Sequence, residues 1–182
     1  IGNYTYYNCN SITQIDLPTQ LTTLGNFAFA ECDGITSLTV PTTLTTIGTH
    51  AFSNCKGLKT IEFESGYLGA YMFSNCSGIT ELSIPNTVTA IGANAFHSYT
   101  KLTSIVIPNS VTSIGKSAFY GCKGLNPPDV PESVDIIEQY AFYGIDTIFY
   151  AGKATGEPWG AKRVVRGTVK DSNFVYSDST KS

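Results

Sequence analysis

The stretch Leu102–Leu125, LTSIVIPNSVTSIGKSAFYGCKGL, holds one complete copy of the unit from which most of this 182-residue chain is built. Its first six residues are rich in β-branched side chains, which favours a strand. Ile105 and Ile107 are two residues apart, so they share one face of that strand. Pro108 ends the strand because proline has no backbone N–H for a ladder hydrogen bond. The first half of the unit therefore predicts a short strand with one apolar face.

The second half of the unit predicts the path by which the chain returns to the next strand. Val111 and Ile114 are expected to turn inward again. The segment around Ala118 and Phe119 is too short for more than about two helical turns, so it predicts a short helix or 3₁₀ turn on the back of the coil. A left-handed backbone conformation would explain why glycine often precedes the next strand. The glycines in this position are Gly34, Gly57, Gly78 and Gly124.

The unit recurs along the chain at a nearly fixed spacing, with one shortened copy in which Glu64 takes the proline position. The proline column is Pro18, Pro41, Pro85, Pro108 and Pro131. The aromatic column is Tyr6, Phe29, Phe52, Phe73, Phe96, Phe119 and Phe142. The next column is Cys9, Cys32, Cys55, Cys76, Tyr99 and Cys122. Self-similarity at a period of this length is typical of stacked solenoids.

One unit cannot enclose a core alone, so stacking must bury the apolar columns of neighbouring coils against each other. The strands of adjacent coils are expected to pair into one parallel sheet, with right-handed connections. The opposite side is expected to carry the short helical or 3₁₀ turns and short extended segments. Residues 1–150 would form about seven coils. The expected strands are Ile12–Leu17, Ile35–Val40, Leu58–Phe63, Ile79–Ile84, Leu102–Ile107, Leu125–Val130 and Ile145–Tyr150.

The periodicity stops after Tyr150, and residues 151–182 predict a β-rich C-terminal cap or the start of a linker or further domain. Trp159 is expected to help cover the open end of the array. A β-hairpin is possible between the segments RVVRGTV and NFVYS. The charge also changes here, from −6 in residues 1–150 to +3 in residues 151–182. This change of sign suggests a different kind of segment.

Composition excludes some functional classes. Apolar residues make up 42% of the chain and charged residues only 14%, so Thr, Ser and Asn must supply much of the polar surface. The net charge of −3 gives no general case for nucleic-acid binding. No apolar run approaches the ~20 residues that span a bilayer, and no signal peptide is present. The start at Ile1, inside a repeat, suggests a fragment or processed product, so location does not follow from a missing signal.

Cysteine and histidine are the residues most often used for metal, redox or catalytic chemistry. The cysteines do not have the close spacing of a zinc site, although neighbouring coils would bring them within disulfide range. Tyr99 substitutes in their column, which favours buried, reduced thiols over a disulfide or a metal. His50 and His97 lie about two coils apart without a nucleophile motif, so they predict exposed, variable positions. No cofactor, metal site or catalytic residue is expected.

Two columns should face outward from the sheet, and they are the candidate ligand-binding residues. These candidates are Gln14, Asp16, Thr39, Thr60, Glu62, Glu81, Ser83, Ser104, Val106 and Asp129. A solvated surface is the first interpretation and part of a binding face the second. Glu62 and Glu81 could form a weak acidic patch on adjacent coils, but nothing in the sequence indicates the enclosure that a glycosidase pair needs. The basic residues Lys162, Arg163, Arg166 and Lys170 favour a solvated hairpin over an anion site.

The pattern L-x-x-I-x-I-P-x-x-V-x-x-I-G-x-x-A-F-x-x-C, seen in Leu102–Cys122 and Ile79–Phe96, resembles the BspA-like leucine-rich repeat. The resemblance covers about residues 1–150 and implies an α/β leucine-rich-repeat solenoid. The sequence departs from the family pattern in the shortened copy at Glu64–Met72, at Tyr99 and at Glu138. The family implies a bacterial secreted or surface-attached protein that binds host or matrix proteins and other cells.

We therefore expect a non-enzymatic binding module of a bacterial secreted or cell-surface protein, acting in adhesion or in protein or glycan recognition. The alternative is a structural spacer that displays another domain of a longer protein. The expected partner is a protein or glycan, including those of the host or its matrix, and not nucleic acid. The expected location is extracellular or on the bacterial surface. The sequence does not indicate an oligomeric state or the identity of the ligand.

Overall fold

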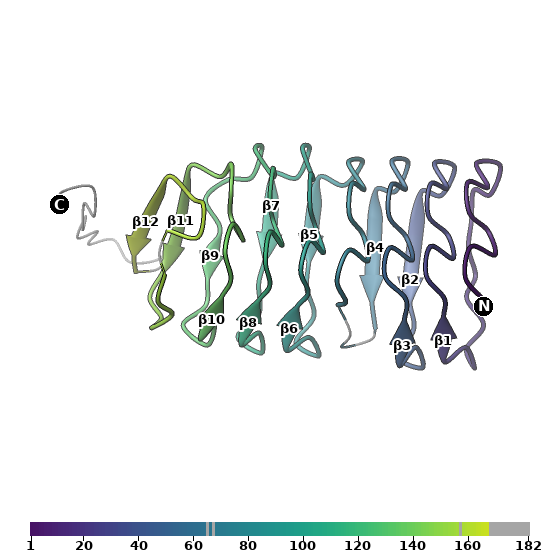
Figure 1. Cartoon of the computed structure of the whole chain (residues 1–182), viewed down its shortest axis with the longest axis horizontal. Helices are drawn as coiled ribbons and strands as arrows, with labels where there is room; N and C mark the ends of the chain where they lie inside the picture. Colours follow the sequence, from purple (N-terminus) through teal and green to yellow (C-terminus); the bar gives the residue numbers. More distant parts are fainter. Residues whose placement is uncertain (65, 67, 157, 168–182) are drawn as a thin grey trace.

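The computed structural model describes residues 1–64, 66, 68–156 and 158–167, which form a stack of coils (Figure 1). Strands in neighbouring coils pair in parallel. Ser37 is the partner of Thr60, and Glu81 is the partner of Ser104. The members of both pairs are one repeat period apart in the sequence, so one repeat makes one coil. The register thus follows directly from the period of the sequence.

The longer strands form the main side of the solenoid. They are β2 (Ser37–Val40), β4 (Thr60–Phe63), β5 (Glu81–Ser83), β7 (Ser104–Val106), β9 (Asp129–Val130), β11 (Thr147–Tyr150) and β12 (Arg163–Arg166). Hydrogen bonds join them in three groups, β2–β4, β5–β7 and β9–β11–β12. Six of the seven predicted strands are confirmed, each shorter than expected. The seventh, Ile12–Leu17, is wrong, because no ladder joins this end segment to β2.

A second row of two-residue strands runs along the lower edge of the stack in Figure 1. These are β1 (Thr23–Leu24), β3 (Thr46–Ile47), β6 (Ala90–Ile91), β8 (Ser113–Ile114) and β10 (Ile136–Ile137). Each contains an inward residue such as Ile47 or Ile114, which is 6% or 0% exposed. They correspond to the short extended segments that were expected on the return path, where Ile114 turns inward.

The turn side, opposite the main strands, is not helical. None of the described residues lies in a helix, so the predicted helical or 3₁₀ turns are not confirmed. Instead, residues with positive φ recur four positions apart in the turn, as at His50 (60°) and Asn54 (60°). In the coil before, the N–H of Phe27 donates to the Thr49 carbonyl at 3.1 Å and that of Glu31 to the Ser53 carbonyl at 2.8 Å. Left-handed residues therefore turn their amides toward the next coil, which a helix could not do.

The glycines before the strands are explained by close packing and not by backbone conformation. None of Gly34, Gly57, Gly78 and Gly124 has a positive φ, so the predicted left-handed conformation is wrong. A Cβ on Gly57 would lie 1.9 Å from the Asp33 carbonyl oxygen, and one on Gly34 would lie 2.3 Å from that of Asn10. Coils therefore approach too closely at this corner for a side chain.

The core is a continuous apolar column along the solenoid axis. Phe52, Phe73 and Phe119 are each no more than 1% exposed, and stacked rings continue from coil to coil at 5.5 Å between Phe52 and Phe73. Burying one such ring stabilises the fold by about 1.5–3 kcal/mol. Because these rings stack on their equivalents in neighbouring coils, each coil is stabilised by its neighbours.

The parallel ladder continues beyond residue 150. β12 pairs in parallel with β11, so it is not one arm of a tight hairpin, and the second arm expected at NFVYS lies outside the described residues. Trp159 is 3% exposed and meets the Tyr150 ring edge-on at 5.5 Å. The Ala154 amide donates to the Tyr150 hydroxyl at 2.8 Å, and this hydroxyl donates to the Val134 carbonyl. Trp159 thus packs against the Tyr150 ring, and its role as a cover of the open end stays a prediction.

Candidate binding surface

The outward side chains of the main strands form the sheet face, which we define by the two predicted columns. In β2, Leu38 and Val40 point inward while Ser37 and Thr39 are exposed. The alternation follows from the two-residue period of a strand. β5 repeats it, with Leu82 buried between Glu81 and Ser83. The apolar residues are thus used for stacking, and the residues between them are free to contact another molecule.

The structure places eight of the predicted site residues on the main strands β2 to β9, whereas Gln14 and Asp16 precede them outside any strand. Nine of the ten candidates are exposed, and the tenth, Asp129, is half-buried. Two polar contacts join pairs of them directly. The Thr39 hydroxyl donates to a Glu62 carboxylate oxygen at 3.4 Å, and the Gln14 amide donates to the Asp16 carboxylate at 3.0 Å. The face is therefore a broad, open array of hydroxyl and carboxylate groups.

The acidic residues of the face are solvent-facing. Glu62 on β4 and Glu81 on β5 are both exposed, and their strands are not hydrogen-bonded to each other. The shortened repeat between them prevents a matched register here. Both carboxylates are therefore open to water. Recognition of a polar or cationic surface suits this pair better than acid–base chemistry.

The sheet face is interrupted between β7 and β9. Pro127 and Pro128 stand where other copies have residues with an N–H, so β9 pairs with β11 but not with β7. Ile105 is consequently half-buried, whereas its equivalents Leu38 and Leu82 are only 3% and 5% exposed.

A shallow cavity of about 380 Å³ lies at this break. Its lining includes Ile105, Val106, Asp129, Pro131 and Glu132. Val106 is 59% exposed, which makes it the most exposed apolar side chain of the sheet face. The cavity therefore combines an apolar floor with a carboxylate rim, inside the region that the sequence predicted.

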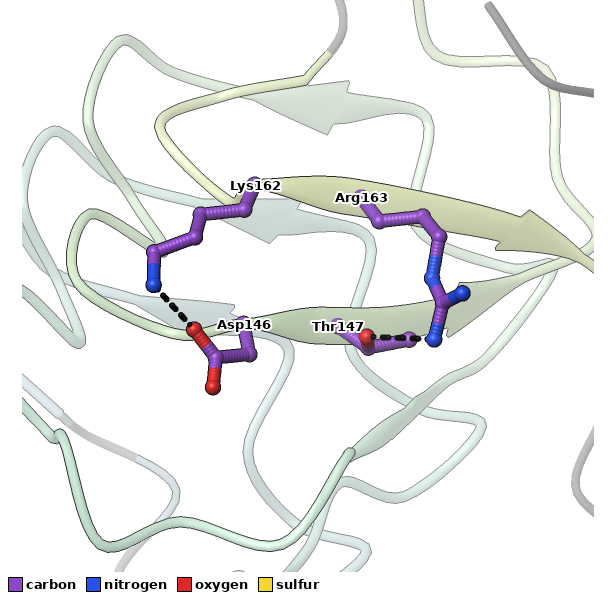
Figure 2. A network of polar contacts seen from close by, with 4 residues as sticks. All are labelled: Asp146, Thr147, Lys162 and Arg163. Atoms are coloured by element: carbon purple, nitrogen blue, oxygen red, sulfur yellow. Dashed lines mark hydrogen bonds and ion pairs between the residues drawn. The ribbon is translucent and has the colours of Figure 1, made fainter.

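The basic residues at the C-terminal end are held by local contacts (Figure 2). Lys162 forms an ion pair with Asp146 at 2.6 Å, which raises the pKa of the lysine. Arg163 donates to the Thr147 hydroxyl at 3.2 Å, and Arg166 donates to the Gly152 carbonyl at 2.9 Å. Lys170 lies outside the described residues. The three described side chains bind parts of their own chain, which supports the solvated-surface interpretation over an anion site.

The cysteine column is buried, as predicted, except at its first member. Cys9 is half-buried, and the other four thiols are no more than 1% exposed. Each buried thiol donates to the carbonyl of an aromatic-column residue in the coil before, for example Cys55 to Phe29 at 3.2 Å and Cys122 to Phe96 at 3.3 Å. All five cysteines are free. The thiols therefore act as buried hydrogen-bond donors that tie one coil to the next.

Burial also controls the acidity of these thiols. It raises the pKa of Cys32 to about 11 and that of Cys122 to about 12. A hydrogen bond with the Cys76 thiol, together with burial, raises the pKa of Cys55. Thiolates, which are the reactive form, are accordingly disfavoured at neutral pH.

The histidines correct another prediction. His50 and His97 are half-buried members of aromatic stacks and not exposed variable positions. His50 stacks between Phe27 at 4.6 Å and Tyr71 at 4.5 Å, and His97 stacks on Tyr120 at 5.0 Å. Burial lowers the pKa of both imidazoles. The sequence does contain the signal for these stacks, because their aromatic residues recur at the repeat period.

Metal sites and membrane-spanning helices can both be assessed among the described residues. Among those residues, no group of three or more His, Cys, Asp or Glu side chains is arranged to hold a metal ion. No helix within the same ranges has the length and hydropathy needed to cross a membrane.

Comparison with known proteins gives one family match. The sequence profile for the "BspA type Leucine rich repeat region (6 copies)" matches residues 1–126 and 66–150. No curated protein matches the chain.

Several solved structures of bacterial leucine-rich repeat proteins are similar to this fold. The Bacteroides ovatus protein is 23% identical with a TM-score of 0.71, over 93% of this chain and 47% of its own. The T. pallidum protein is 27% identical with a TM-score of 0.68, over 79% of this chain and 68% of its own. The Eubacterium ventriosum protein is 25% identical with a TM-score of 0.70, over 85% of this chain and 41% of its own. The chain thus spans less than half of the B. ovatus and E. ventriosum proteins.

Proposed function

Because the chain belongs to the BspA-type leucine-rich repeat family, we propose that it is a non-enzymatic binding module of a bacterial secreted or cell-surface protein. It recognises another protein or a glycan through the sheet face. The observation that carries this proposal is the contrast between the two sets of strand positions. The inward columns hold nearly the same apolar residues in every coil, while the outward columns vary and are exposed.

The sheet face has the properties of a recognition surface. A solenoid presents such a face over many coils, which suits a macromolecule better than a small ligand. Hydroxyl groups such as Thr39, Thr60 and Ser104 supply hydrogen-bond donors and acceptors, and Asp16, Glu62 and Glu81 supply negative charge. Residues 1–150 carry a net charge of −6, so a partner with a basic surface would be attracted at long range. Adhesion would then rest on many modest polar contacts.

An extracellular or surface location belongs to the same proposal. One solved structure of similar fold, from Faecalibacterium prausnitzii, is described as a leucine rich cell surface protein. It is 19% identical to this chain, with a TM-score of 0.54, over 90% of this chain and 62% of its own. Its description supports a surface location through shared fold.

The proposal is tested by measuring binding of the chain to immobilised extracellular-matrix proteins and to a glycan array. The sheet-face variant Asp16→Asn, Glu62→Gln, Glu81→Gln keeps side-chain size and removes three charges. We expect it to weaken the strongest interaction by about tenfold, because each exposed charge pair contributes up to about 1 kcal/mol. The matched control is Glu31→Gln, Glu64→Gln, Asp135→Asn, which removes three carboxylates outside the two outward columns. Equal binding by the wild type and both variants would remove the sheet face from the proposal.

A structural spacer is the second candidate, and the inter-coil hydrogen bonding favours it. Backbone hydrogen bonds join successive coils on the main side, in the second row and on the turn side, for example Phe29 to Ala51 at 2.8 Å and Gly48 to Leu24 at 2.8 Å. Such a stack is expected to be stiff. A spacer role would be favoured if the repeats bound nothing while the full-length protein bound a partner through another domain.

A further inference from the structure

Aromatic rings on the turn side stack from coil to coil in two ladders, which the sheet face does not involve. The first ladder consists of Tyr4, Phe27, His50 and Tyr71, and the second of His97, Tyr120 and Tyr143. In the second ladder the His97 and Tyr120 ring centroids are 5.0 Å apart and the ring planes are nearly parallel, at 3°. Tyr120 and Tyr143 continue it at 4.6 Å and 11°. Each inner ring therefore has a neighbour on both faces.

Tyr143 ends the second ladder, and none of the described residues stacks on its second ring face. One of its faces stacks on Tyr120, and Tyr140 approaches it perpendicularly at 5.9 Å. On the far side the chain places Gly160, whose backbone comes so close that an added Cβ would lie 2.9 Å from the Tyr143 Cα. Gly160 has no side chain to cover the ring, and Tyr143 remains 47% exposed.

An open cavity of about 590 Å³ adjoins this ring. It is lined by Lys123, Tyr143, Gly144, Asp146, Gly160 and Lys162. Its volume lies within the ~300–1,000 Å³ of typical ligand sites. The exposed ion pair between Lys162 and Asp146, 2.6 Å long, places a donor and an acceptor at the rim (Figure 2). The cavity thus has a flat aromatic wall and polar groups of both kinds beside it.

We propose that this cavity binds one pyranose ring of a neutral glycan, with the sugar stacked on Tyr143. A pyranose has an apolar face of axial C–H groups, which suits the negative face of an aromatic ring. Its equatorial hydroxyls project sideways, where the Asp146 carboxylate accepts and the ammonium groups of Lys123 and Lys162 donate. A nucleobase or an aromatic peptide would also stack, but through a π face, whereas a pyranose brings polarised C–H groups to the negative face of the tyrosine ring. The site is separate from the sheet face.

The experiment titrates the chain with cellohexaose, chitohexaose and maltohexaose, using calorimetry and saturation-transfer NMR. AMP and a tyrosine tripeptide serve as alternative stacking ligands. We expect at least one hexasaccharide to bind. Tyr143→Ala should weaken this binding about tenfold, whereas Tyr143→Phe should keep it within about threefold because the ring remains. Asp146→Asn should weaken it several-fold.

The control is Tyr71→Ala, which removes an exposed tyrosine from the end of the other ladder. We expect this variant, and the sheet-face variant, to bind the sugar like the wild type, so the two proposals can fail independently. Circular dichroism checks that each variant folds. The proposal is overturned if no hexasaccharide binds, if Tyr143→Ala binds the sugar as well as the wild type does, or if only AMP or the peptide binds.

Discussion

At the scale of single residues, close contact between coils decides which amino acids are allowed. Gly57 has no room for a Cβ because the Asp33 carbonyl oxygen would lie 1.9 Å away. The left-handed positions of the turn side are instead held by side-chain-bearing residues such as His50 and Asn54. Each left-handed non-glycine residue costs of order 1 kcal/mol. At Phe27, Glu31 and Asn54 the backbone N–H donates to a carbonyl of the next coil, and this hydrogen bond offsets the cost.

The first prediction compares two glycines of the same column. Gly57→Ala should lower the free energy of unfolding by about 3 kcal/mol, because its new methyl group would collide with backbone that cannot move aside. Gly124→Ala should change it by less than about 1 kcal/mol, since the nearest oxygen would be 3.1 Å away and the unfolded chain loses entropy. Urea unfolding followed by circular dichroism measures both. Equal destabilisation would refute the close-packing explanation.

The second prediction concerns the thiols. At pH 8 a thiol reagent such as Ellman's reagent should modify Cys9 within minutes, while Cys32, Cys55, Cys76 and Cys122 should react only after denaturation. The reason is that burial removes reagent access to all four thiols and raises the pKa of Cys32 and Cys122, while a hydrogen bond with Cys76, together with burial, raises the pKa of Cys55. Cys9→Ser should abolish the fast phase. Rapid reaction of two or more thiols in the native protein would contradict the buried column.

At the scale of elements, the sequence predicted the main strands well and the turns poorly. Strand positions follow from alternation and from proline, which are local properties, so β2, β4, β5, β7, β9 and β11 could be located. The turn conformation depends on hydrogen bonds to the next coil, which no single repeat contains. The failure of Ile12–Leu17 has the same origin, since a strand is defined by its pairing with a neighbour.

The candidate surface was likewise predicted only in part. Its ten residues were assigned to one face because side chains alternate along a strand, and eight of them lie on the main strands, whereas Gln14 and Asp16 do not. The break in the sheet beside Val106 was not predicted. Pro127 and Pro128 do indicate it, because they remove two backbone N–H donors from the ladder. The exposure of the Tyr143 ring could not be predicted, because it depends on where Gly160 packs after the periodicity ends.

The third prediction addresses this break. Replacing Pro127→Ser and Pro128→Ile restores the residues of the regular unit and two N–H groups. We expect β9 to pair with β7 and the free energy of unfolding to rise by about 1 kcal/mol, since each added hydrogen bond contributes roughly 0.5–1.5 kcal/mol and loss of proline costs part of it. Hydrogen exchange at Ile105 and Val106 should slow. Asn126→Thr is the control, because it changes a side chain without adding a donor. Unchanged exchange and stability in the double variant would contradict the account.

At the scale of the whole molecule, the inside of the solenoid is uniform and the outside is variable. The apolar columns specify stacking in every coil, so they cannot distinguish one partner from another. Apart from Tyr99 in the cysteine column, the main differences between coils lie in the exposed columns, in the shortened repeat and at the C-terminal end. Recognition by this chain is therefore expected to depend on exposed residues that contribute little to folding.

The most direct test of the central claim is a carboxylate footprint of the chain bound to the partner found in the binding screen. A carbodiimide reagent labels exposed carboxylates, and mass spectrometry reports each site with and without the partner. We predict that the partner protects Asp16, Glu62 and Glu81 on the sheet face and leaves Glu31 and Asp135 labelled as before. Protection of Glu31 or Asp135, with unchanged labelling of all three sheet-face carboxylates, would contradict recognition through this face.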